Sequence, residues 1–155
     1  MLSIKSTNGF KTKYDIFDTE VKIGSIVKSN WTNTFTITLP DRNLVMQAEK
    51  WYRSNRVVLE NEAEIAKVTK KLFTLKPRFF VEYNKRTFVL RPTNFMQTEF
   101  ALSLGEEGAF IGNITRSGVF SNTYEADLPD SIELWFQCVL ICIIVEYKLT
   151  QAAAS

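Results

Sequence analysis

The C-terminal residues 128–149 constrain the fold of this chain most strongly, because they have the pattern of a helix without a polar face. Pro129 suits the first turn of a helix, and Asp130 and Glu133 complement the positive end of its dipole. Lys148 complements the negative end. Between these signals, large apolar side chains point in every direction of the helical wheel. We therefore predict a helix from 129 to 148 that the rest of the chain must enclose.

A transmembrane span is the alternative interpretation of this segment. A span needs about 20 mainly apolar residues. Here Gln137 interrupts the apolar run, with Glu133 before it and Glu146 after it. The uninterrupted stretch is too short, so we predict a core helix and no transmembrane span.

The cysteines and the composition indicate one soluble domain in a reducing compartment. Cys138 and Cys142 lie four residues apart on the apolar helix, where their side chains stack along one face instead of meeting in disulfide geometry. We predict that both are buried free thiols. The chain has 155 residues, of which 45% are hydrophobic, and no N-terminal signal segment is indicated. We expect a single cytoplasmic domain over 1–150 and a short tail over 151–155.

The rest of the chain has the alternating pattern of β-strands. Threonine, valine, isoleucine, phenylalanine and tyrosine dominate short segments that are separated by turn residues, as expected for strands with one wet and one buried face. Consecutive segments pair into hairpins. The predicted strands are 14–17, 21–29 with a shift of phase near Gly24, 35–39, 44–48, 56–60, 64–69, 78–83, 86–91, 100–104 and 109–114.

A short pattern recurs in the second strand of three of these hairpins. The stretches 23–28, 65–70 and 111–116 each contain an isoleucine, a tiny residue, any residue, a β-branched aliphatic residue, valine or threonine, and a base. The tiny residues are Gly24, Ala66 and Gly112. Such a residue lets the backbone of a curved sheet bend or approach a neighbour closely. We interpret the repeat as a structural device and not as a ligand site.

These elements predict a mainly β fold, a closed antiparallel barrel wrapped around the buried C-terminal helix. About ten strands followed by a single late helix do not form the alternating arrangement of a parallel sheet. Closing the strands around the helix removes unpaired strand edges and gives the helix an apolar surround.

The order of these motifs resembles the tubby C-terminal-like superfamily, in particular the LURP-one-related proteins and the phospholipid scramblases. The resemblance rests on the hairpins with the Ile-Gly-x-Ile-x-Lys pattern, then Asp-Leu-Pro-Asp at 127–130, then the buried terminal helix. It covers about 14–149. It implies a barrel of about twelve strands and relatives that are associated with membranes and phosphoinositides or have no assigned activity.

The chain departs from the scramblase pattern in two respects. We expect no proline-rich N-terminal extension, and only Glu125, Asp127 and Asp130 lie near the position of the acidic calcium-binding segment. A calcium ion needs six or more oxygen ligands at fixed spacing, and acids beside a helix start more often serve as caps. We predict no metal site and no cofactor, and leave calcium at Asp127 and Asp130 open.

The composition also argues against an enzyme. The chain contains no histidine, which removes Ser-His-Asp and Cys-His catalysis and the usual general base near neutral pH. The tip 105–108 is a hairpin turn and not a phosphate-binding loop. We therefore expect a non-enzymatic binding domain.

The charges divide the sequence into two unlike parts. Residues 42–91 carry twelve bases against five acids, whereas the residues from 92 onward carry two bases against eight acids. Five bases that are close in sequence form a candidate face for anionic lipid headgroups. They are Lys67, Lys70, Lys71, Lys76 and Arg78, although strand alternation puts Lys67 and Lys70 on opposite faces unless a bulge intervenes.

Two function classes follow from the sequence. The first is peripheral docking of a cytoplasmic protein on anionic phospholipids, with phosphoinositides favoured over monoanionic lipids. The second is a structural or interaction module that binds a protein partner or a second copy of itself. Nucleic acid is less favoured, because the aromatic residues beside the bases, Trp51, Tyr52 and Phe79, are expected to pack inward.

Overall fold

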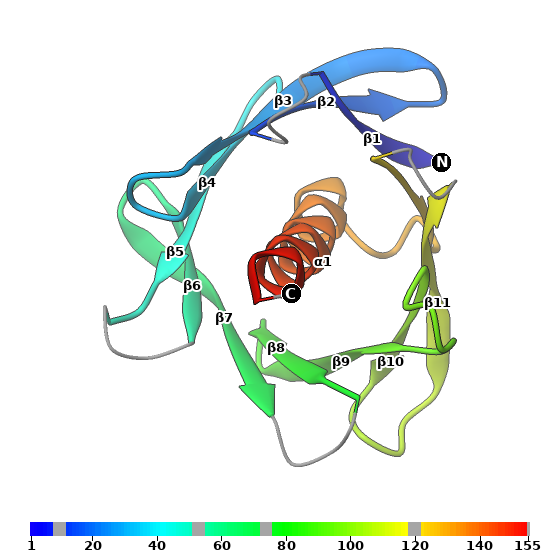
Figure 1. Ribbon diagram of the computed structural model, residues 1–155. Helices are drawn as coiled ribbons and strands as arrows, with labels where there is room; N and C mark the ends of the chain where they lie inside the picture. The colour runs from blue at the N-terminus through cyan, green and yellow to red at the C-terminus, as the bar shows by residue number, and fades with distance from the viewer. Residues whose placement is uncertain (8–11, 51–54, 72–75, 118–121, 155) are drawn as a thin grey trace.

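The computed structural model describes residues 1–7, 12–50, 55–71, 76–117 and 122–154. Twelve antiparallel strands close into one barrel, and a single helix runs through its interior (Figure 1). The strands are β1 (Leu2–Ser6), β2 (Lys13–Asp18), β3 (Val21–Ser29), β4 (Thr34–Thr38), β5 (Asn43–Ala48), β6 (Arg56–Glu60), β7 (Ala63–Lys71), β8 (Arg78–Tyr83), β9 (Arg86–Pro92), β10 (Glu99–Leu104), β11 (Phe110–Ser117) and β12 (Thr123–Asp127). The helix is α1 (Leu134–Ala154).

The fold class is the one predicted, and the predicted strands correspond to β2–β11 with small shifts at their ends. The two strands that sequence patterns did not indicate are β1 and β12. They pair with each other, with Ile4 opposite Tyr124, and so close the barrel. Each has only five residues, two of which face the core. So short a segment shows too little alternation to be recognised alone.

The middle of α1 is enclosed, as predicted. Residues 135–145 are all buried, and they pack against buried side chains from the barrel wall. The boundaries differ from the prediction, because the helix begins at Leu134 and continues to Ala154. Pro129 and Asp130 are exposed in a turn, which the backbone N–H of Ile132 closes by donating to the carbonyl of Pro129. The last two turns of the helix are only partly covered or exposed.

The polar side chain within the apolar run has a structural role. Gln137 is buried, and its amide Nε2 donates a 2.8 Å hydrogen bond to the carbonyl of Ile132. Its backbone N–H donates to the carbonyl of Glu133. By length and composition alone, 134–153 is apolar enough to cross a membrane. Instead, the side chains of 135–145 are packed against the barrel wall, as in the core helix of a soluble protein.

The three repeated stretches lie on β3, β7 and β11, which is every fourth strand around the barrel. In all three, the pairing with the preceding strand shifts register where the isoleucine stands, at Ile23, Ile65 and Ile111. A β-bulge bends a strand and increases its twist. The barrel therefore consists of three similar four-stranded units, and the repeat is a structural device, as interpreted from the sequence.

The glycines of the repeat allow a close approach between strands. A Cβ atom on Gly24 would lie 2.1 Å from the backbone oxygen of Thr38, and one on Gly112 would lie 2.3 Å from that of Asp127. The strands concerned, β4 and β12, both continue into Leu-Pro-Asp, at 39–41 and 128–130. The corresponding Ala66 of the middle unit pairs in register with Tyr83 of β8.

Substituting the first of these glycines should destabilise the protein. In Gly24→Ala the new methyl group would collide with backbone rather than with a flexible side chain, so β3 and β4 must move apart. We expect a loss of about 1–3 kcal/mol of unfolding free energy, the range for overpacking. Chemical denaturation measures it. The control Ser25→Ala alters the neighbouring side chain and should change stability by less than about 0.5 kcal/mol. Equal effects of the two substitutions would contradict the close approach.

Both thiols are buried and free, as predicted, and should react only when the barrel opens. Burial raises the pKa of Cys138 to about 12 and that of Cys142 well above its ordinary value. Little thiolate is therefore present near neutral pH. We expect a bulky thiol reagent to label native protein at the rate of unfolding and denatured protein within seconds to minutes. Rapid labelling of the native state would show that one face of α1 is accessible.

Candidate functional site

The two ends of the barrel differ in chemistry, and the strand order defines them. Because neighbouring strands alternate in direction and β12 leads into α1, every connection from an even-numbered to an odd-numbered strand lies where the helix begins. We call this the proximal end, and the end where α1 finishes the distal end. The contacts agree with this: Tyr83, at the end of β8, bonds to Glu133, and Lys148 donates to the carbonyl of Met96 between β9 and β10.

The connections at the proximal end are acidic. They comprise residues 19–20, 39–42, 61–62, 84–85, 105–109 and 128–133, and all are described. None contains an aromatic residue, and their only bases are Arg42 and Lys85. Their acids are Glu20, Asp41, Glu62, Glu106, Glu107, Asp130 and Glu133.

The described connections at the distal end expose large apolar side chains, whereas at the proximal end the exposed apolar residues, such as Val21 and Phe110, stand on strand ends. Trp31, in the turn between β3 and β4, is 96% exposed, and Phe95, between β9 and β10, is 92% exposed. Met96 beside it is 68% exposed. The other four connections at this end include residues 8–11, 51–54, 72–75 and 118–121, which lie outside the described residues. In sequence each also contains an aromatic residue.

Bases surround these apolar tips. The strand ends and connections at the distal end, with the last turns of α1, carry Lys13, Lys28, Lys50, Arg56, Lys70, Lys71, Lys76, Arg78, Arg91, Arg116 and Lys148 against the acids Glu49, Glu99 and Glu146. The division of charge seen along the sequence therefore becomes, in part, a division along the barrel axis. Isolated exposed apolar residues need no explanation, but exposed aromatic residues among bases at one end form a candidate binding surface.

The five bases predicted as a single face do not share one surface. Lys70 faces the interior at the distal end, where its ammonium lies 5.1 Å from the ring centre of Tyr147 on α1. Lys67 is the register partner of Glu82 on the neighbouring strand. Its ammonium forms an ion pair with the carboxylate of Glu49, at 3.0 Å. Glu49 raises the pKa of Lys67, mainly through a side-chain hydrogen bond. Lys67 is thus neutralised locally and Lys70 is turned inward, away from Lys67.

Lys71 and Arg78 are brought together, and a third base joins them. Lys71 is the register partner of Arg78, and Phe79 pairs with Leu90, which places Arg78 beside Arg91 on the next strand. Lys71 and Arg91 are exposed. Arg78 is partly offset, because its guanidinium lies 3.4 Å from the carboxylate of Glu106 in the proximal turn 105–109. Lys76 is exposed just before β8. We call Lys71, Arg78 and Arg91 the basic row.

Sequence reasoning missed part of this surface. Arg91 was outside the predicted cluster, although the pairing of 78–83 with 86–91 was predicted and aligns it with Arg78. Trp31, Phe95 and Met96 stand in turns, where no periodicity reveals exposure. The predictions for Trp51 and Tyr52 lie outside the described residues. Phe79 packs inward, as expected, with its ring 5.6 Å from that of Tyr147.

The acids near the helix start do not converge. Tyr124 and Ala126 of β12 are buried, so Glu125 and Asp127 point to the outer face, and Asp130 is exposed in the following turn. Over the described parts of the chain, no group of three or more histidine, cysteine or acidic residues is placed to hold a metal ion.

The proximal end is held by a network around the residue that precedes α1. The carboxylate of Glu133 accepts hydrogen bonds from Tyr83 Oη, at 3.1 Å, and from Trp135 Nε1. Arg42 Nη1 lies 3.6 Å from the same carboxylate. Arg42 also donates to both oxygens of Glu60, at 2.6 and 2.8 Å. This network connects the helix start to the ends of three strands.

Comparison with protein-family models, curated proteins and solved structures finds no match to this chain. The resemblance to the tubby C-terminal-like superfamily therefore stays a prediction.

The pair of Arg42 and Glu60 predicts how stability depends on pH. The guanidinium lowers the pKa of Glu60 below its ordinary value of 4.5, mainly by hydrogen bonding. A lowered pKa in the folded state means that the stabilisation is complete above about 4.5 and is lost as the pH falls through the folded value. In Glu60→Gln we expect a flatter acid limb in the plot of unfolding free energy against pH. Wild type and variant should converge at low pH.

The matched control for this pH series is Glu62→Gln. Glu62 lies two residues away in an exposed turn and makes no ion pair with a described residue. Its substitution should leave the acid limb unchanged. Parallel curves for wild type and Glu60→Gln over the whole range would show that the bond to Arg42 adds no pH-dependent stability.

Proposed function

We propose that this protein is a non-enzymatic peripheral membrane-binding domain that docks the distal end of its barrel on anionic phospholipids. The single observation that carries the proposal is the coincidence of exposed Trp31, Phe95 and Met96 with the basic row at that end. Aromatic side chains are favourable at the level of lipid headgroups. Bases beside them add attraction to an anionic surface.

The magnitudes support reversible binding. Each base close to an anionic membrane contributes about 1 kcal/mol. Lys71, Lys76 and Arg91, together with two inserted aromatic side chains, can therefore supply micromolar affinity after the loss of orientational freedom. Arg78 adds less, because Glu106 offsets its charge. Screening by salt should weaken the attraction, since the screening length falls to about 8 Å at physiological ionic strength.

The acidic proximal end supports one orientation of docking. Its acids would be repelled by the same surface that attracts the distal end. We therefore expect the barrel axis to be steeply inclined to the membrane plane, with the proximal end pointing away from the lipid. The helix then remains inside the barrel, and only turns and side chains reach the lipid. Phosphoinositides, which carry more charge per headgroup, should bind more tightly than monoanionic lipids. The resemblance to tubby-like proteins agrees with that preference.

Co-sedimentation with liposomes tests the proposal. Wild-type protein should bind vesicles that contain phosphatidylserine or a phosphoinositide, and binding to phosphatidylcholine alone should be much weaker. Lys71→Glu/Arg91→Glu removes two attractive charges and adds two repulsive ones, so affinity should fall by at least about 30-fold. Trp31→Ala/Phe95→Ala should also weaken binding, with a smaller dependence on salt.

Matched variants at the proximal end serve as controls. Lys22→Glu/Lys85→Glu makes the same change in net charge near the helix start, and Phe110→Ala removes an aromatic ring that is 63% exposed. Both should bind liposomes as wild type does. Equal losses in the distal and proximal variants would overturn the proposed face. Absence of binding by all the proteins would overturn the lipid role and favour a protein partner or self-association.

A further inference from the structure

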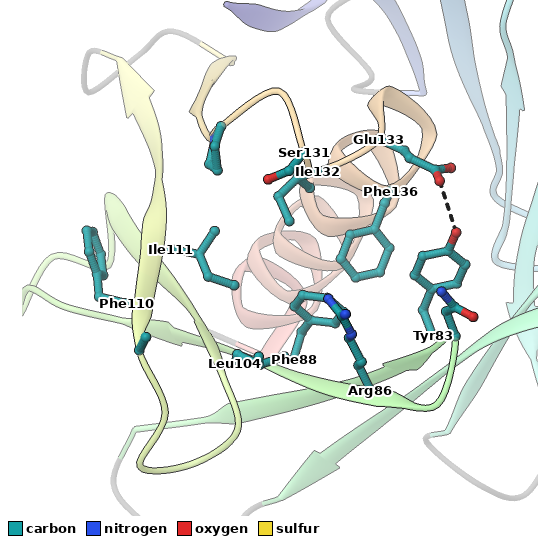
Figure 2. Close-up of a pocket in the computed structure, with 13 residues that line it drawn as sticks. Tyr83, Arg86, Phe88, Leu104, Phe110, Ile111, Ser131, Ile132, Glu133 and Phe136 are labelled. Atoms are coloured by element: carbon teal, nitrogen blue, oxygen red, sulfur yellow. Dashed lines mark hydrogen bonds between the residues drawn. The ribbon is translucent and has the colours of Figure 1, made fainter.

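A cavity of about 460 Å³ opens at the proximal end, with Glu133 on its wall. It lies between the wall formed by β8–β11 and the turn that leads into α1 (Figure 2). Apolar side chains from both sides form its interior: Phe88, Leu104, Ile111, Ile132 and Phe136. Binding sites for small molecules have this size and this apolar lining, with a few polar groups that fix the orientation of the ligand.

One positively charged side chain on the wall of this cavity has no acidic partner among the described residues. Arg86 extends from the start of β9 toward the rings of Phe88 and Phe136, as Figure 2 shows. Its guanidinium makes no ion pair or hydrogen bond with any described residue. The acid on the cavity wall, Glu133, is already occupied by Tyr83, Trp135 and Arg42. Arg86 is therefore available to an anion from outside.

The neighbouring groups make the site amphipathic. Ser131 and Asn84 line the same cavity and offer a hydroxyl group and an amide near its mouth. Tyr83 also lines the cavity, but its hydroxyl donates its one hydrogen to Glu133, and burial together with that bond raises its pKa. An incoming carboxylate thus meets a cation and neutral polar groups, whereas its carbon skeleton meets aromatic and aliphatic side chains.

We propose that this cavity binds a small carboxylic acid with an apolar body, such as a medium-chain fatty acid or an aryl carboxylate, with its carboxylate on Arg86. A guanidinium binds a carboxylate through two parallel hydrogen bonds, which favours this headgroup over a hydroxyl group or an amine. The apolar body would displace water from the side chains that the helix start leaves uncovered. The proposal does not depend on membrane docking, because no residue of the basic row lines the cavity.

Titration calorimetry and thermal unfolding with octanoate test the assignment. Octanoate should bind and raise the melting temperature, because a ligand that binds only the folded state stabilises it. Octanol, which lacks the charge, should bind at least about tenfold more weakly. Arg86→Ala should reduce octanoate affinity to that of octanol. Ala109→Trp, which introduces a large ring at the exposed rim without altering the core, should prevent binding.

Arg91→Ala is the matched control, since it removes the same side chain from the same strand at the distal end. It should retain octanoate affinity while weakening liposome binding, and Arg86→Ala should do the reverse. Equal affinities for octanoate and octanol, or no effect of Arg86→Ala, would overturn the role of the cation. Binding that persists in Ala109→Trp, or an absence of octanoate binding by wild type, would overturn the cavity as the site.

Discussion

The fold depends on one requirement, the burial of a helix that has no polar face. The side chains of 135–145 cannot be left in water on any side, so a covering layer on one side would not suffice. A closed barrel solves this because alternate residues of every strand point inward around the full circumference. The barrel in turn needs the helix, since twelve strands enclose a lumen too wide for side chains of the wall alone to fill.

Much of the architecture could be predicted from the sequence because it follows from local periodicity. Strands such as β6 and β8 were predicted with their observed bounds, and the shift of phase predicted near Gly24 corresponds to the bulge at Ile23. The closing strands β1 and β12 were not predicted, since each has only five residues and is stabilised by pairing with a strand about 120 residues away. The helix start was placed too early, because Pro129 and Asp130 have the same preferences in a turn as in a first helical turn.

The candidate site was less predictable, for a reason that applies to any barrel. Clustering along the sequence selected Lys67 to Arg78, but side-chain alternation turns Lys70 into the lumen, and a cross-strand acid neutralises Lys67. The surface that remains is assembled across strands, and it includes Arg91 and turn residues that no local pattern identifies. Residues that are close in the sequence lie along one strand, whereas a binding face is formed by residues from several neighbouring strands.

The threefold recurrence of bulged strands has a consequence for the helix inside. A wall built from three similar units repeats its backbone bulges every third of a circle, whereas α1 has no such symmetry. The backbone of the wall alone would therefore allow three similar rotational settings of the helix about its axis. Directional contacts at its two ends remove that degeneracy: Glu133 with Tyr83 at one end, and Glu146 with Arg56 at the other, at 2.9 and 3.0 Å. These polar contacts thus fix one of the three possible rotations of α1 about its own axis.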